Sequence, residues 1–185
     1  MLEMIEIYVD GSAINNENPN KPTLGGVGMV VIGLYPDSAV KHGEVHGFHF
    51  TVANDKLVDL NDRILDLGKT TNNTTELAAI YLALDFFERS KHVLKHGRLT
   101  LPTKIYGDSQ YAGNLVFGNW KPKENKELVA KVRQLASEVP NVTWEYVKAH
   151  ADNEYNNYAD YLARCGAYKT PENEVLPFNE WLLTA

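Results

Sequence analysis

Cysteine is nearly absent from this sequence, since Cys165 is the only one in 185 residues. A disulfide within the chain is therefore excluded, and a cysteine-based zinc site is not expected. Long apolar runs are also missing, and none approaches the roughly 20 residues that a membrane-spanning helix needs. Residues 1–4 carry no basic segment ahead of an apolar one, so we expect no signal peptide. Together these absences predict a cytoplasmic protein without a membrane partner.

Internal repeats and linker-like segments are missing as well, and the length suits one compact domain, which we expect to be monomeric. The net charge of −6 argues at first sight against a nucleic-acid partner. The local distribution of charge matters more than the sum, and residues 121–133 hold five basic side chains against two glutamates. The sequence therefore predicts a modest, salt-sensitive affinity for a polyanion.

Hydrophobic patterning predicts an α/β fold. Strands are predicted at residues 4–10, 25–34, 103–106 and 142–147, and helices at residues 74–89, 109–117, 125–138 and 154–167. Two further strand signals, at residues 44–52 and 63–67, flank a polar segment at 54–56. The pattern leaves open which of them is the third core strand and which is an inserted hairpin. Three strands followed by alternating strands and helices favour a five-stranded mixed sheet flanked by helices on both faces.

Four carboxylates stand in short, distinctive contexts: Asp10, Glu76, Asp108 and Asp160. Asp10 and Asp108 each end a predicted strand. If these strands are adjacent and parallel, both side chains lie at the strands' carboxyl ends, where ligands bind in open α/β sheets. Oxygen ligands without a Cys or His cluster suit hard divalent cations. The four residues therefore predict metal-dependent phosphodiester chemistry.

Glu76 belongs to the helix predicted at residues 74–89. Thr74 or Asn73 can cap that helix, because short hydroxyl and amide side chains accept hydrogen bonds from its first N–H groups. Glu76 would then lie in the first turn, near the positive end of the helix dipole.

Several short motifs occur in one order along the chain: Asp10-Gly11-Ser12, the glycine-rich residues 25–28, residues 71–77, Asp108-Ser109-Gln110, and His150 with Asn156 and residues 159–163. With these motifs the sequence resembles ribonuclease HI, the type 1 ribonuclease H family, over about residues 4–168. The resemblance implies a ribonuclease H-like catalytic domain at residues 1–168, followed by a tail at residues 169–185. We expect the tail to dock on the domain, and a partner-binding peptide is the alternative.

The activity implied by the resemblance is endonucleolytic hydrolysis of the RNA strand of an RNA–DNA hybrid, which leaves 5′-phosphate and 3′-hydroxyl ends. Two Mg²⁺ ions, with Mn²⁺ as the expected substitute, would be held by Asp10, Glu76, Asp108 and Asp160, and Asp10 would bridge them. His150 would assist proton transfer or product release, and a surface histidine is the alternative. A catalytically weak hybrid-binding protein and a DNA-cutting nuclease of the same superfold are the competing functions.

The resemblance also implies a set of substrate contacts. Amides at Asn72, Asn73 and Gln110 would read the minor groove, where 2′-hydroxyls distinguish RNA from DNA, although Asn73 also suits a helix cap. The expected contacts are Gly11, Ser12, Thr71, Asn72, Asn73, Ser109, Gln110, Trp120, Lys121, Lys123 and Asn156.

Two departures from the family pattern stand out. The basic handle of the best-known bacterial members is replaced by Gly118–Asn125, as in handle-less members, so weaker substrate affinity is expected. Trp120 would stack on a sugar there, with Lys121 and Lys123 on phosphates, and a buried Trp120 that anchors the helices is an equal alternative. The second departure is extra length at residues 35–69, whose role the sequence leaves open. It carries His42, His46 and His49, but strand alternation would not bring all three to one face, so no metal is expected there.

Overall fold

A five-stranded sheet forms the centre of the protein, in a computed structural model that describes residues 4–34, 45–93 and 102–185. The strands are β1 (Met4–Ile14), β2 (Leu24–Leu34), β3 (Val45–Val52), β6 (Thr103–Gly107) and β7 (Val142–Tyr146). They lie in the order β3-β2-β1-β6-β7, with β1, β2 and β3 antiparallel and with β6 and β7 parallel to β1. The predicted mixed sheet is confirmed.

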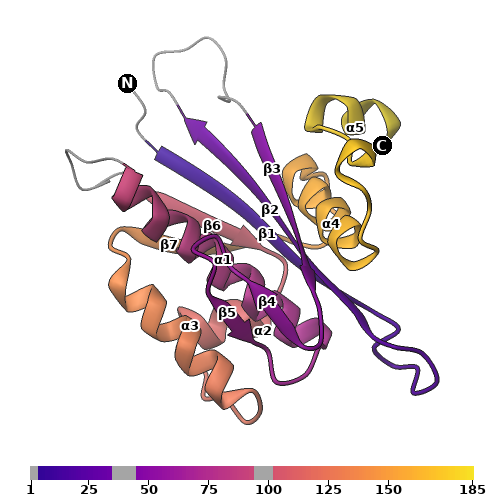
Figure 1. Ribbon diagram of the computed structural model, residues 1–185. Helices are drawn as coiled ribbons and strands as arrows, with labels where there is room; N and C mark the ends of the chain where they lie inside the picture. The colour runs from indigo at the N-terminus through magenta and orange to yellow at the C-terminus, as the bar shows by residue number, and fades with distance from the viewer. Residues whose placement is uncertain (1–3, 35–44, 94–101) are drawn as a thin grey trace.

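Helices cover both faces of this sheet (Figure 1). One face carries α1 (Asn72–Val93), α2 (Gln110–Val116) and α3 (Lys126–Glu138), and the other carries α4 (Glu154–Ala167). Buried aliphatic side chains of β1, β2 and β6 pack against α1 and α3 in the larger core. A smaller core lies between the sheet and α4, around Tyr158 and Leu162. The two cores fix both layers of helices relative to the strand that carries Asp10.

The third core strand is β3, so the structure decides between the two strand signals. Asn54 and Asp55 form a two-residue turn with φ of 51° and 60°, and Ala53 and Lys56 on either side exchange backbone hydrogen bonds of 2.9 and 3.0 Å. Positive φ at both turn residues matches the right-handed twist of a hairpin. The chain then forms a small sheet of β4 (Lys56–Val58) and β5 (Ile64–Asp66). The second signal therefore belongs to an added hairpin.

The first turn of α1 differs from the prediction. The helix begins at Asn72, and Thr71 precedes it: the Thr71 hydroxyl accepts from the Thr74 N–H at 3.1 Å, while the Thr71 N–H donates to the Thr74 hydroxyl at 2.8 Å. This reciprocal pair has the geometry of a capping box. Capping by Thr74 or Asn73 is therefore wrong, and Glu76 lies beyond the first turn.

A buried ionic network ties the β4–β5 hairpin to α1. Arg63 contacts two fully buried carboxylates, with Nε 3.0 Å from Asp59 and Nη2 2.7 Å from Asp85. The Tyr81 hydroxyl donates to Asp59 at 2.8 Å, and Asn61 also donates to Asp85. Each buried charge thus has partners, as a low-dielectric interior requires.

Arg63→Ala is expected to lower the free energy of unfolding by about 2–3 kcal/mol, because it leaves two buried carboxylates without their cation. Urea denaturation of the metal-free protein measures the loss. Lys56→Ala is a matched control, since it removes an exposed cation from the same hairpin, and it is expected to change the value by less than about 0.5 kcal/mol. Equal effects of the two substitutions would show that the network does not stabilise the fold.

The end of the chain packs against α4. The Tyr158 hydroxyl donates to the Leu176 carbonyl at 2.8 Å, and the Leu176 N–H donates to the Tyr161 hydroxyl at 2.9 Å. A short helix, α5 (Phe178–Thr184), follows the 3-10 turn Glu172–Glu174, and it places Trp181 with its ring centroid 5.2 Å from that of Tyr158. Two hydrogen bonds between tyrosine hydroxyls and the Leu176 backbone, together with an aromatic cluster, therefore hold residues 176–181 in place.

His46 and His49, which belong to the extra length at residues 35–69, lie on opposite faces of β3. His49 pairs with Glu172 at 3.2 Å, and His46 lies an odd number of residues away on the same strand. His42 lies outside the described residues. Over the described ranges, the one group of three or more potential metal ligands is formed by Asp10, Glu76 and Asp108.

Candidate active site

Asp10 and Asp108 lie where two parallel strands separate. The pairing of β1 with β6 ends at Tyr8 and Tyr106, and both aspartates follow that last pair by two residues. β1 itself continues to Ile14, paired with β2, so the prediction that Asp10 ends a strand is wrong. The carboxylates nevertheless occupy the carboxyl-terminal opening between adjacent parallel strands, where an α/β sheet presents its ligand site.

Glu76 reaches this opening because α1 crosses β1 at a glycine. A Cβ added to Gly11 would lie 2.4 Å from the backbone carbon of Thr75 and 2.5 Å from the Glu76 nitrogen. A Cβ atom cannot lie this close to backbone atoms, so only glycine at position 11 allows α1 to approach β1 so closely. The Gly11 N–H also donates to Asp10 Oδ1 at 3.0 Å. Gly11 thereby sets the distance between the first two carboxylates.

The three carboxylates of Asp10, Glu76 and Asp108 converge, with one oxygen from each lying within 4.8 Å of the others. Burial, reinforced by the charges of Glu76 and Asp108, raises the pKa of Asp10 well above its ordinary value. Burial likewise raises the pKa of Glu76 to about 8, and it raises the pKa of Asp108. Converging carboxylates that disfavour ionisation could hold a divalent cation, because the cation's charge would offset their repulsion.

The stability of the metal-free protein is expected to fall as pH rises. Glu76 is ionised above about pH 4.5 in the unfolded chain but keeps its proton up to about pH 8 in the folded one, so the folded state binds more protons in that window. In EDTA, the melting temperature of wild type should therefore fall relative to that of Glu76→Gln as pH rises from about 4.5 to about 8. Added Mg²⁺ should restore wild type at the upper end. A pH-independent difference between the two proteins would contradict the raised pKa.

Asp160 is carried to the site by α4, which packs closely on β2. Cβ atoms added to Gly26 and Gly28 would lie 2.1 Å from the Ala163 carbonyl oxygen and 2.0 Å from that of Ala159. Asp160 lies outside the group of three, but its charge raises the pKa of both Asp10 and Asp108. Its own carboxylate pairs with Arg164 at 3.2 Å. The structure thus brings three predicted ligands together and places the fourth beside them.

His150 and Asn156 also adjoin Asp108. His150 has a left-handed backbone, with φ of 53°, and lines a pocket together with Asp160. Asn156 is only 2% exposed and hydrogen bonds to Asp108, which opposes the rise in the pKa of that carboxyl. Its Oδ1 atom is buried without a hydrogen-bond partner. The structure therefore places Asn156 against a proposed metal ligand rather than at the surface, and a positioning role suits it better than a substrate contact.

Asn153 was missed by sequence reasoning. It caps α4 by accepting a hydrogen bond from the Asn156 N–H at 3.0 Å, and so fixes the start of the helix that holds Asp160. An asparagine directly before Glu154 is the signal that could have identified it.

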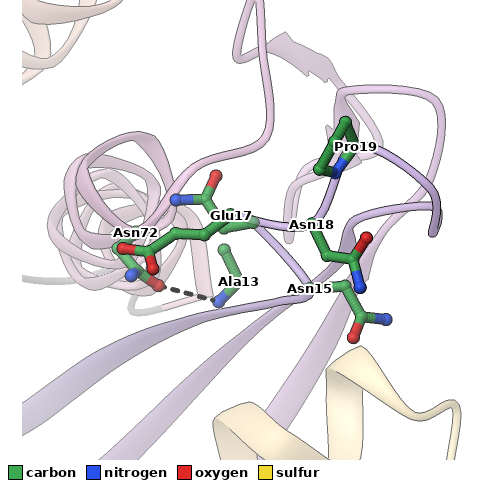
Figure 2. Close-up of a pocket in the computed structure, with 7 residues that line it drawn as sticks. Ala13, Asn15, Glu17, Asn18, Pro19 and Asn72 are labelled. Carbon is green, nitrogen blue, oxygen red and sulfur yellow. Dashed lines mark hydrogen bonds between the residues drawn. The ribbon is translucent and has the colours of Figure 1, made fainter.

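A second missed group lies in the turn after β1. Asn15, Asn16 and Asn18 line a pocket of about 530 Å³ together with Asn72, which comes from the start of α1 (Figure 2). The Ala13 N–H donates to Asn72 Oδ1 at 3.3 Å, as the dashed line shows. The three asparagines among residues 15–18 are the sequence signal that could have identified this group. These amides extend the polar surface on which Asn72 was predicted to meet the substrate.

The remaining predicted substrate contacts fall into two groups. Thr71 and Ser109 cap α1 and α2. The Thr71 hydroxyl accepts from the Thr74 N–H, and the Ser109 hydroxyl accepts from the Ala112 N–H, each at 3.1 Å. Asn73 and Gln110 are exposed beside them, and Ser12 is half-buried. The caps have a structural role already, whereas the exposed amides are free to face a ligand.

The segment that replaces the handle lies on the surface. Residues 117–125 alone join α2 to α3, and Trp120 is 51% exposed, with Lys121 and Lys123 exposed beside it. Arg133 supports the segment by donating to the Trp120 carbonyl at 2.6 Å. A buried Trp120 anchor is therefore wrong, and the indole is available for stacking.

None of the described helices combines the length and the apolar character needed to cross a membrane.

The sequence model of the RNase H family matches residues 3–168. The chain belongs to the RNase H family. Over 178 residues it is 32% identical to a Ribonuclease H from Ehrlichia canis, and the match covers 88% of this chain and 94% of that protein. A Ribonuclease H from Prosthecochloris aestuarii is 38% identical over 109 residues, which cover 51% of this chain and 67% of that protein.

Solved structures agree on the fold. LC9-RNase H1, a type 1 RNase H with the type 2 active-site motif, superposes with a TM-score of 0.62 at 21% identity, covering 98% of this chain and 81% of its own. LC11-RNase H1, solved in complex with RNA/DNA hybrid, superposes with a TM-score of 0.58 at 24% identity, covering 89% of this chain and 97% of its own. The predicted family, fold class and enzyme class are thus confirmed.

Proposed function

We propose that this RNase H-family enzyme is an endoribonuclease that hydrolyses the RNA strand of RNA–DNA hybrids and leaves 5′-phosphate and 3′-hydroxyl ends. The observation that carries the proposal is the convergence of Asp10, Glu76 and Asp108 within 4.8 Å at the opening between β1 and β6. The likeness to LC11-RNase H1, which was solved with an RNA/DNA hybrid, supports the choice of substrate.

The residues present fit two Mg²⁺ ions, with Mn²⁺ as a substitute. Every donor is a carboxylate oxygen, which hard cations prefer, and burial raises the pKa of three of the four carboxyl groups. Asp10, Glu76, Asp108 and Asp160 would hold the ions. When bound, the ions supply an activated water and stabilisation of the leaving 3′ oxygen.

The other site residues would orient the substrate and move protons. His150 would take part in proton transfer near the attacking water or in release of the product. The exposed amides of Asn72, Asn73 and Gln110 would contact base edges and 2′-hydroxyls, which is how a protein distinguishes RNA from DNA. Trp120 would stack on a sugar, while Lys121 and Lys123 meet phosphates.

A panel of labelled duplexes tests the proposal. Wild type is incubated with RNA–DNA hybrid, double-stranded RNA and double-stranded DNA, each with Mg²⁺ and with EDTA. We expect cleavage of the hybrid alone, and only with Mg²⁺. Cleavage of duplex DNA would instead indicate a DNA-cutting nuclease of the same superfold. Hybrid binding without any cleavage would indicate a protein that has kept only recognition.

A further inference from the structure

A pocket of about 330 Å³ lies beside Asp160, and the tail of the chain forms part of its wall. It is lined by His150, Asn157, Asp160, Tyr161, Arg164 and Trp181. Trp181 belongs to α5 and lies beyond residue 168, where the match to the family ends. The pocket therefore combines proposed catalytic residues with a side chain that the family domain does not contain.

Trp181 is held firmly in this position. Leu176, five residues earlier, is fixed by hydrogen bonds with both Tyr158 and Tyr161 on α4. The Trp181 ring centroid lies 5.2 Å from that of Tyr158 and 6.1 Å from that of Tyr161. An indole fixed against two tyrosines offers a stacking surface at little entropic cost.

The pocket has the chemistry of a nucleotide site. Arg164 is 57% exposed at its side chain and contacts Asp160 through one nitrogen, at 3.2 Å. A guanidinium carries five donors and suits phosphate, so further N–H groups remain for a ligand. Tyr161 stacks on Tyr158 and on Trp181, whereas the half-buried indole of Trp181 keeps accessible surface that suits a base or a ribose. The volume corresponds to the lower end of ligand pockets, about 300 Å³, which suits a single nucleotide.

We propose that this pocket binds the 5′-phosphorylated end of the RNA that cleavage releases, with Arg164 on the phosphate and Trp181 against the terminal nucleoside. The inference rests on the proposed function. Of the two ends produced, only this one carries a terminal phosphate, so the exposed guanidinium of Arg164 would select it over the 3′-hydroxyl end. The tail thereby becomes part of the substrate site and slows departure of the product.

The test compares two product hybrids that differ only in the RNA end, one with a 5′-phosphate and one with a 5′-hydroxyl. Their Kd values are measured by fluorescence anisotropy in EDTA, where no cleavage of the hybrids is expected. Wild type is expected to bind the phosphorylated end about tenfold more tightly, the effect of one or two charge-assisted hydrogen bonds. Arg164→Gln should abolish this preference, and Trp181→Ala should weaken binding of both ends while Trp181→Phe largely keeps it.

Lys131→Gln is the matched control, because it removes an exposed positive charge from α3, away from the pocket, and it should leave the preference intact. Arg164 is exposed, so its substitution tests the pocket even if Trp181→Ala unfolds the tail. Equal affinity of wild type for the two ends, or an unchanged preference in Arg164→Gln, would overturn the inference. If wild type cuts the hybrid yet shows no preference, only the pocket assignment fails; if it cuts nothing, the proposed function fails.

Discussion

Asp10→Asn is expected to lower hybrid cleavage by at least about a thousandfold, because the proposed metal site would supply several kcal/mol of transition-state stabilisation. The same substitution should raise the melting temperature of the metal-free protein by about 5 °C at neutral pH, since it removes a buried carboxyl whose pKa burial and its neighbours have raised. Asparagine keeps the shape of the side chain and can still accept from the Gly11 N–H. A substitution that lowers activity but raises stability is characteristic of a site whose charges bind a ligand and do not stabilise the fold.

Cleavage rates and thermal melts, each with Mg²⁺ and with EDTA, measure both effects. Asp62→Asn is the matched control, because Asp62 is exposed and its φ of 61° suits asparagine equally well. It should behave as wild type in every assay. If Asp10→Asn is stabilised by Mg²⁺ as much as wild type is, Asp10 is not a ligand.

Gly28→Ala is expected to have the second largest effect, through displacement of α4. The new Cβ would lie 2.0 Å from the Ala159 carbonyl oxygen and 2.6 Å from the Ala163 nitrogen. Backbone atoms cannot yield locally, so the helix must move outward and carry Asp160 with it. We expect a loss of about 2–3 kcal/mol in unfolding free energy. Because a displacement of about 1 Å can cost about a hundredfold in rate, kcat/KM should fall by about that factor.

Urea denaturation and steady-state kinetics measure the two losses. Gly47→Ala is the comparison, because its Cβ would meet only side-chain atoms of the same helix, those of Tyr158 and Leu162, at 2.9–3.0 Å. Side-chain ends can shift, so its effects should be smaller. A destabilised Gly28→Ala protein with full activity would show that the position of Asp160 does not limit catalysis.

The sheet and the motif residues could be predicted because they depend on short-range signals. Alternating apolar residues before Asp10 and Asp108 define two strands, and parallel pairing then brings the carboxylates together whatever the rest of the chain does. The continuation of β1 to Ile14 was missed, because its partner there is β2 rather than β6 and residues 10–12 have no apolar alternation.

Other features depend on contacts that the sequence does not reveal. Thr71 and Thr74 are equivalent as caps until the hydrogen bonds show which residue precedes the helix. The pairing of Asp59 and Asp85 through Arg63 joins residues far apart in the chain, and β4 and β5 are too short to carry a reliable pattern. The environment of Asn156 arises only when α4 docks on the sheet, and Trp181 comes near Asp160 only when the tail docks on α4.

The most direct test of metal-dependent hydrolysis of RNA in a hybrid uses one duplex with different labels on its RNA and DNA strands. After incubation with Mg²⁺, the fragments are mapped and their ends are identified with a phosphatase and a primer-extending polymerase. We expect cuts in the RNA strand alone, extendable 3′-hydroxyl ends, 5′-phosphates, and no cutting in EDTA. Cuts in the DNA strand, cyclic or 3′-phosphate ends, or full activity in EDTA would contradict the assignment of the carboxylates as a metal site for this reaction.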